Sequence, residues 1–145
     1  MKTPSQDAIV AFHNWNNAFN NRDAEEQIKY MHFPHLRLAN DKYQLWDTPD
    51  DFRKLQESMT ENLMKENWHH TTTLSIEDIQ SGEDKVHLAI LQSRRDINDI
   101  EYNQFQTFWI FTKEQKNWKA RFRSSFLTNT NANGTGSKNP FNPYQ

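Results

Sequence analysis

The chain has no cysteine and no long apolar run, and its charges almost cancel. The absence of cysteine excludes disulfide bonds, thiol catalysis and cysteine metal ligation, and it is typical of proteins from reducing compartments. No apolar run approaches the ~20 residues that span a bilayer, and no apolar leader follows Met1. A formal net charge of −2 attracts neither nucleic acid nor an anionic membrane. These absences predict a cytoplasmic protein that binds neither nucleic acids nor membranes.

The chain is rich in aromatic side chains. Only 34% of its 145 residues are hydrophobic, but 13% are aromatic. The length suits one domain, at about 100–150 residues. A core of few, large rings around a curved sheet often leaves a pocket, and such rings usually line ligand sites. We therefore expect Trp15, Trp46, Trp68 and Trp109 either to line a ligand cavity or to pack as ordinary core.

Helix signals fill the first half of the chain. Thr3 predicts the N-cap of a helix that continues to about residue 20. It is followed by proline at the first helical position and by glutamine at the third. Asp23 begins a short second helix, which must end before Pro34 because the residue preceding a proline is held extended. A third helix is predicted over residues 48–67, where Thr48 and Pro49 repeat the first pattern.

The strand signals predict one antiparallel sheet. They comprise a hairpin over residues 35–39 and 42–46, a strand from Trp68 to Ile76, and three long strands over Lys85–Asp96, Tyr102–Thr112 and Trp118–Leu127. The middle long strand is apolar on both faces, which requires helices on one side and, we expect, a partner subunit on the other. This predicts a homodimer through the outer sheet face. If Trp109 and Phe111 lie on that face, an aspartate at either position should yield monomers.

The composition changes after Leu127. Residues 128–145 are mostly Asn, Thr, Gly, Ser and Pro, and they cannot bury enough apolar surface to fold alone. The sequence therefore predicts one domain over residues 1–127 and a flexible polar tail over residues 128–145.

Several segments together resemble the nuclear transport factor 2-like (SnoaL-like, ketosteroid-isomerase-like) superfamily. They are the aromatic first helix, Tyr30–Ala39 (YMHFPHLRLA), the capped helix from Thr48, Trp68-His69-His70 and Trp118–Phe126 (WKARFRSSF). The resemblance spans Thr3 to Leu127. It implies a cone-shaped α+β fold, in which a strongly curved antiparallel sheet wraps the N-terminal helices, encloses a pocket and forms dimers through its outer face.

The resemblance does not specify a reaction. Members of the superfamily include isomerases, cyclases, dehydratases, epoxide hydrolases and proteins that only bind partners, and fold does not choose among them. The tyrosine–aspartate pair of the steroid isomerases has no match in this sequence. The Asp-Arg-Asp set of the epoxide hydrolases has none either.

Two histidines are the candidate bases. His35 and Arg37 share one face of a strand, where a neutral imidazole can accept a proton near pH 7 and a fixed guanidinium can hold an oxyanion. The alternative is that both brace the hairpin. His70 shares its side of a strand with Trp68, so it is the second candidate, and the alternative is a core histidine with a satisfied hydrogen bond.

Other polar residues complete the candidate site. Tyr30 or Arg37 would hold developing negative charge. If Arg123 faces the pocket, it can bind an anion there. If it faces outwards, it can pair with acidic residues of a partner subunit. The opposite face of the strand, with Trp118, Ala120, Phe122 and Phe126, is apolar and resembles a core, so the outward direction is favoured. The histidines His32, His35, His69 and His70 follow no ligand spacing, so we predict no metal and no cofactor.

We therefore expect a protein that binds a small apolar or aromatic ligand with a polar end. Cofactor-free acid–base chemistry of the isomerase, dehydratase or cyclase type is the reaction that such a pocket could support. The alternative is a non-catalytic dimeric binding or protein-interaction module. An open cavity with a histidine and an arginine converging on it would favour the first function, and a sealed core would favour the second.

Overall fold

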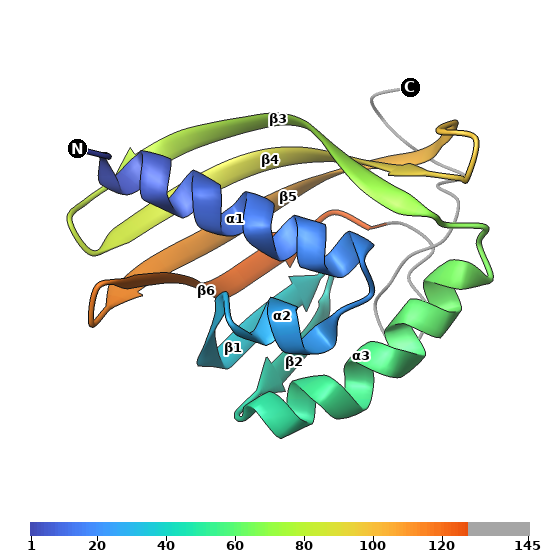
Figure 1. Cartoon of the computed structure of the whole chain (residues 1–145), viewed down its shortest axis with the longest axis horizontal. Coiled ribbons are helices and arrows are strands. Elements are labelled where there is room, and N and C mark those ends of the chain that lie inside the picture. Colours follow the sequence, from blue (N-terminus) through green and yellow to red (C-terminus); the bar gives the residue numbers. More distant parts are fainter. Residues whose placement is uncertain (128–145) are drawn as a thin grey trace.

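Three helices lie on one side of a bent sheet in the computed structural model, which describes residues 1–127 (Figure 1). The predicted tail, residues 128–145, lies outside the described residues. The elements in chain order are α1 (Pro4–Asn20), α2 (Ala24–Ile28), β1 (Met31–Ala39), β2 (Lys42–Trp46), α3 (Pro49–Met64), β3 (His70–Ser81), β4 (Lys85–Arg95), β5 (Glu101–Glu114) and β6 (Asn117–Ser125). The predicted α+β class is confirmed.

The six strands form one sheet in the order β2-β1-β6-β5-β4-β3. Four of the neighbouring pairs are antiparallel, and β1 pairs with β6 in parallel. The sheet is therefore mixed, and not antiparallel throughout as the sequence predicted. The cause is the crossover through α3, which starts the β3–β6 meander at the far edge of the sheet. Three reversals then return β6 beside β1 in the same direction.

Capping residues set the two long helices as predicted. Thr3 and Thr48 each accept a hydrogen bond from the backbone of the third helical residue, whose side chain bonds back to the cap. Both helices then begin with proline, which is preorganised for the first turn. The third helix ends at Met64, earlier than expected, and β3 begins at His70. Within the described part of the chain, no helix is both long and apolar enough to cross a membrane.

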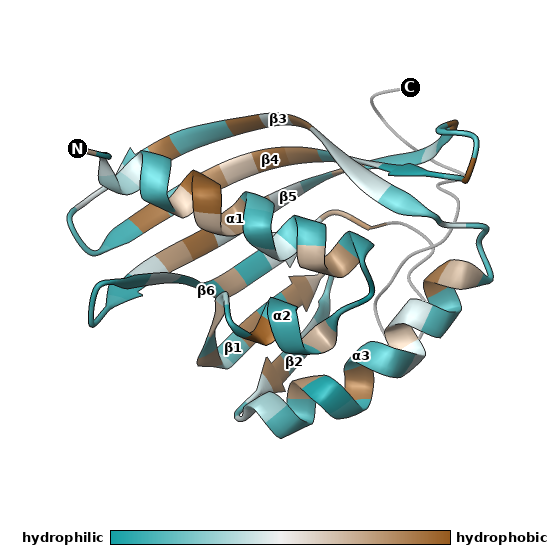
Figure 2. Ribbon diagram, viewed as in Figure 1, coloured by the Kyte–Doolittle hydropathy of each residue, from teal (hydrophilic) through white to brown (hydrophobic). Residues whose placement is uncertain are grey.

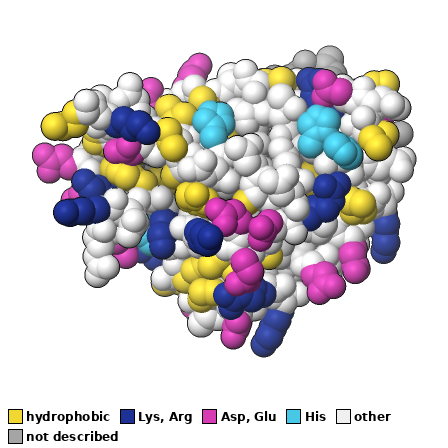
Figure 3. All heavy atoms as spheres, viewed as in Figure 1, with side chains coloured by type: hydrophobic (Ala, Val, Ile, Leu, Met, Phe, Trp, Pro, Cys, Tyr) yellow, Lys and Arg dark blue, Asp and Glu magenta, His cyan; other side chains and the backbone are white. Residues whose placement is uncertain are grey.

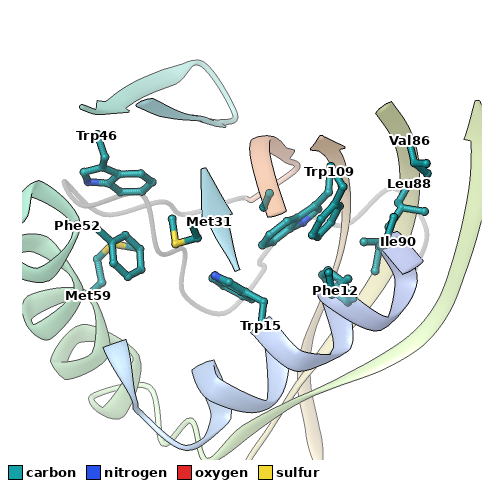
Figure 4. Packing of buried hydrophobic residues seen from close by; sticks show 14 residues of the cluster. Phe12, Trp15, Met31, Trp46, Phe52, Met59, Val86, Leu88, Ile90 and Trp109 are labelled. Atoms are coloured by element: carbon teal, nitrogen blue, oxygen red, sulfur yellow. The ribbon is translucent and has the colours of Figure 1, made fainter. Parts of the chain in front are cut away.

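The core lies between α1 and the inner face of the sheet. Figure 4 shows Phe12 and Trp15 pointing from α1 towards Trp109 of β5. The ring centroids of Phe12 and Trp15 lie 5.1 and 4.8 Å from that of Trp109, in edge-to-face contacts. Trp46 and Phe52 form a second aromatic contact, at 5.5 Å, between β2 and α3. The apolar stretches of α1 and β4 in Figure 2 mark the surfaces that this core joins.

A register shift decides which residues of β6 face inwards. On β5, Trp109 and Phe111 are buried on the inner face. Phe111 pairs with Ala120, but the adjacent Ile110 pairs with Phe122, so the alternation on β6 changes there. As a result Arg123 points inwards with Trp109, its cross-strand partner, and Phe122 points outwards. The expectation that the Phe122 side forms the core is wrong beyond this bulge.

The same alternation corrects the dimer test proposed from the sequence. Trp109 is 3% exposed and Phe111 is fully buried. An aspartate at either position would therefore break the core. Phe108 and Ile110 occupy the outer face instead, since successive side chains of a strand point to opposite sides.

Candidate functional site: an inner cavity lined by arginines

An inner cavity of about 50 Å³ lies between α1, α3 and the sheet. Its lining combines aromatic and aliphatic side chains with three arginines and a group of neutral polar side chains. The residues are Trp15, Asn16, Phe19, Arg37, Met59, Leu63, Thr71, Gln92, Arg94, Phe105, Thr107, Trp109, Arg123, Ser125 and Leu127. Three buried arginines around one small cavity are unusual, because arginine side chains are mostly exposed in proteins.

Arg123 has the least ordinary surroundings of the three. Its guanidinium carbon lies 5.0, 5.4 and 5.3 Å from the ring centroids of Trp15, Trp46 and Trp109. The residue is 7% exposed, and its Nε–H has no hydrogen-bond acceptor. Burial, and then the charge of Arg37, lower its pKa well below the usual value. A guanidinium nevertheless keeps its proton at pH 7, so a positive charge sits inside an aromatic cage.

Arg37 lies beside Arg123 because the parallel register of β1 and β6 pairs the two residues. It is 5% exposed, and its Nη1 donates to Oε1 of Gln44 at 3.1 Å. Burial, and then the charge of Arg94, lower the pKa of Arg37 to about 9. It therefore stays charged at neutral pH and adds positive potential to the cavity.

Arg94 reaches the cavity from β4 and has an acidic neighbour. Its Nη1 lies 3.6 Å from Oε2 of Glu66, which also accepts a hydrogen bond from the Tyr102 hydroxyl at 3.0 Å. Its guanidinium stacks over Phe105 at 4.9 Å. Burial raises the pKa of Glu66, although Arg94 and Tyr102 act in the opposite direction. Glu66 therefore offsets part of the buried charge of Arg94.

Neutral polar side chains form another wall and largely satisfy one another. Gln92 donates to Oδ1 of Asn16 at 3.1 Å, and Asn16 donates to the Thr71 carbonyl at 3.1 Å. The indole N–H of Trp109 donates to the Thr107 hydroxyl at 3.0 Å. Among residues 1–127, no aspartate, glutamate or histidine lines the cavity. The lining formed by the described residues therefore offers cationic and neutral groups to a ligand, and these include no carboxylate or imidazole.

Of the residues singled out from the sequence, the structure brings four to the cavity: Trp15, Arg37, Trp109 and Arg123. Trp46 does not line it but closes the cage around Arg123 from β2. Trp68 is buried elsewhere, where its indole N–H donates to the Thr71 hydroxyl at 3.0 Å.

His35 is buried outside the cavity lining. Its Nδ1 donates to the Ala120 carbonyl at 3.1 Å, and its ring stacks on Trp46 at 5.7 Å. The Nε2 atom has no partner among the described residues. Burial, and then the charge of Arg123, lower the pKa of His35 to about 3. The ring is therefore neutral at physiological pH, in the tautomer with hydrogen on Nδ1.

His70 and Tyr30 also lie away from the cavity lining. His70, at the start of β3, bonds through Nε2 to Asp99 at 2.9 Å and through Nδ1 to His69 at 2.8 Å. Tyr30 is half-buried, and its carbonyl accepts the Ala120 amide at 2.8 Å. Within residues 1–127, no group of three or more His, Cys, Asp or Glu side chains is arranged to hold a metal ion.

Sequence reasoning did not select three polar residues of the cavity: Asn16, Gln92 and Arg94. A signal for each was present. Asn16 falls on the apolar stripe of α1, one turn after Phe12 and one turn before Phe19. Gln92 and Arg94 continue the inward alternation of Val86, Leu88 and Ile90. Polar residues on a core-facing stripe are the informative exception in a buried pattern.

The fold and its inner cavity define the chain as an NTF2-like domain. The family model described as "NTF2-like protein (DUF6841)" matches residues 6–125, and the chain belongs to this family. A search among curated proteins finds no match.

Solved structures share the fold at low sequence identity. A protein of unknown function with a cystatin-like fold from Nostoc punctiforme is 8% identical, with 100% of both chains covered and a TM-score of 0.71. An NTF2-like protein with a cystatin-like fold from Novosphingobium aromaticivorans is 13% identical, covering 89% of this chain and 84% of that one, with a TM-score of 0.69. An NTF2-like protein of unknown function from Shewanella oneidensis is 12% identical, covering 86% and 99%, with a TM-score of 0.67. These likenesses support the fold alone.

Proposed function

We propose that this protein binds a small molecule whose anionic end enters the inner cavity and contacts Arg123. One observation carries the proposal. Arg123 is buried in the cavity wall, is stacked on three indole rings, and has an Nε–H without an acceptor. Burying a charge without an ionic partner is costly, so a site that retains one is suited to an incoming anion. Arg37 and Arg94 strengthen the positive potential that such an anion would meet.

The geometry favours an oxyanion as the group recognised. A guanidinium presents its N–H groups in a plane, which matches the paired oxygens of carboxylates and phosphates. The tryptophan cage fixes that plane through the faces of its rings, so binding an anion would order few additional side chains. A charge-assisted hydrogen bond contributes about 1.5–3 kcal/mol, and two from one guanidinium would dominate the affinity. Trp15, Phe19 and Leu63 would contact the apolar remainder of the ligand.

Acid–base catalysis through the predicted histidines has little support in this arrangement. A general base must come within about 2.6–3.2 Å of the proton it removes. His35 is sealed behind Trp46 with a pKa of about 3, and His70 is paired with Asp99, outside the cavity lining. We therefore favour a binding protein for an anionic ligand over an isomerase or dehydratase. The cytoplasmic location stays a prediction.

The burial of the three arginines makes the proposed anion site internal. Acidic and basic side chains are intermixed on the face in Figure 3. The three arginines of the cavity are 5–7% exposed, so they contribute little to the outer surface. Anion binding would therefore depend on entry into the cavity.

The test compares Arg123→Met with Arg121→Gln. Arg121 lies two positions earlier on β6, is half-buried, and pairs with Glu114 outside the cavity. Benzoate and acetate, with benzamide and acetamide as neutral counterparts, should be titrated by calorimetry. We expect an acid to bind the wild type and Arg121→Gln equally, and Arg123→Met at least tenfold more weakly. Equal binding of acid and amide, or an intact response in a folded Arg123→Met, would contradict the proposal.

We also propose that the outer sheet face joins two copies of this chain. Across the strands, Leu45, Leu36, Phe122 and Ile110 pair in one continuous apolar row. Leu45 is 48% exposed, and Phe126, the residue after β6, is 67% exposed. The middle of the face carries no charged side chain, since the adjacent row contains Leu38, Ser124, Phe108 and Ala89. An apolar surface whose middle carries no charge fits a second copy of itself, because a dimer would cover both.

A further inference from the structure

We propose that Trp15 is a second hydrogen-bond donor of the anion site, and that the anion it shares with Arg123 is a short-chain carboxylate such as acetate or propionate. This inference rests on the proposed function and specifies a further binding residue and the ligand class. Two observations carry it: the buried donors around the cavity that have no acceptor, and the space inside the cavity.

Two buried donors of the cavity lining have no acceptor among the described residues. They are the indole Nε1–H of Trp15 and the Nε–H of Arg123. The other tryptophan of the lining differs, because the indole N–H of Trp109 donates to the Thr107 hydroxyl at 3.0 Å. A buried donor without an acceptor is destabilising, so native structures contain few of them. A ligand that supplies acceptors to both donors would account for the pair.

The two donors belong to side chains that contact each other. The guanidinium carbon of Arg123 lies 5.0 Å from the ring centroid of Trp15, over the face of the ring. The indole N–H lies in the plane of that ring and points outwards from its edge. The donors therefore have different directions. A carboxylate has two acceptor oxygens, so it can bind the guanidinium through one oxygen and the indole N–H through the other.

The space in the cavity favours a short carbon chain. A water-sized group needs roughly 10–15 Å³ of such space. The cavity of about 50 Å³ therefore holds about three to five groups of this size. Acetate and propionate match that number of non-hydrogen atoms, whereas benzoate has about twice as many. Phe19 and Leu63 would contact the methyl or ethyl group of the ligand.

The experiment titrates the wild type, Trp15→Phe and Trp68→Phe with sodium acetate, propionate and benzoate by calorimetry at constant ionic strength. Trp68 is the matched control. Like Trp15 it is 3% exposed, but it lies outside the cavity lining, and its indole N–H donates to the Thr71 hydroxyl at 3.0 Å. We expect acetate and propionate to bind the wild type and Trp68→Phe equally, and Trp15→Phe at least fivefold more weakly. Benzoate should bind the wild type at least fivefold more weakly than acetate.

A second measurement does not need a variant that folds. A new hydrogen bond moves the proton resonance of an indole N–H downfield in nuclear magnetic resonance spectra. Saturating acetate should therefore move the resonance of Trp15 in the wild type. The resonance of Trp68 should stay in place, because its N–H already donates to a hydroxyl.

The outcomes separate this inference from the proposed function. Acetate binding that is lost in Arg123→Met but intact in a folded Trp15→Phe would overturn the role of Trp15 and leave the anion site standing. Benzoate binding as tight as that of acetate would overturn the ligand class alone. Absence of binding by all three carboxylates would overturn both proposals. If Trp15→Phe fails to fold, a Trp15 resonance that does not move in saturating acetate would overturn the inference.

Discussion

Acidification should destabilise the fold through one residue, His35. The pKa of this ring is lowered from 6.5 to about 3 by burial and by the nearby charge of Arg123. An unfolded chain protonates the histidine below pH 6.5, while the folded chain does not until about pH 3. Between these values the unfolded state binds more protons, so stability rises with pH. The contribution of His35 is complete above pH 6.5 and is lost as the pH falls.

The size of this effect follows from the separation of the two pKa values. One pKa unit corresponds to about 1.4 kcal/mol. Two units below 6.5, at pH 4.5, the folded state should therefore have lost roughly 3 kcal/mol through His35 alone. That is a large part of the about 5–15 kcal/mol by which small domains are stable. Three arginines act on the ring, Arg123, Arg37 and Arg121, and all disfavour its protonation.

The assay is urea unfolding of the wild type and of His35→Asn at pH 7.5 and pH 4.5. Asparagine cannot titrate, and its side-chain N–H can replace the Nδ1–H that bonds to the Ala120 carbonyl. All other carboxylates and histidines are shared, so their contributions cancel in the comparison. Between the two pH values, the wild type should lose about 3 kcal/mol more than the variant.

Parallel losses in the two proteins would refute this reasoning. A second measurement does not depend on a variant. In nuclear magnetic resonance spectra, His35 should keep the Nδ1–H tautomer down to about pH 4, since its Nδ1 donates to a carbonyl. An ordinary titration of this ring near pH 6.5 would contradict the pKa that its burial implies.

Two further predictions concern the core and the assembly. Phe12→Ala should lower the free energy of unfolding by about 3–5 kcal/mol, because Phe12 is fully buried against Trp109. A smaller loss would mean that neighbouring side chains fill the cavity left by the phenyl ring. Phe108→Asp should yield monomers in sedimentation experiments if the outer sheet face joins two copies. Asn117→Asp, at the start of β6 in the exposed β5–β6 hairpin, is its control. A monomeric wild type would exclude the dimer.

Local signals predicted the parts of the fold that local chemistry determines. Thr3 and Thr48 were placed correctly as caps, because capping depends on a few neighbouring residues. The turn at Asn40 was also correct, since asparagine tolerates its positive φ of 55°. The pairing of β1 with β6 was not predicted. This pairing depends on where the crossover through α3 places strands β3–β6 in the sheet. No local sequence pattern indicates that position.

The candidate site was predicted in part for the same reason. Arg37 and Trp109 follow a regular alternation, which identified the residues that share their faces but not which face points inwards. The outward direction favoured for Arg123 was wrong, because a register shift between Ile110 and Phe111 reverses the pattern on β6. His70 sits at the first position of β3, where the β4–β5 loop supplies Asp99 as its partner. Such a contact joins segments that are distant in the sequence, so neither segment alone predicts it.

The parallel pairing of β1 with β6 also has a consequence for the order of folding. Arg37 and Arg123 are partners in this ladder although 86 positions separate them (123 − 37). Contacts between residues so far apart form slowly, because a long loop must close before the pairing stabilises it. On a ribosome, β1 and β2 would emerge long before β6 and would have no strand on their inner edge. The wall of the cavity that carries both arginines would therefore be among the last parts of the molecule to assemble.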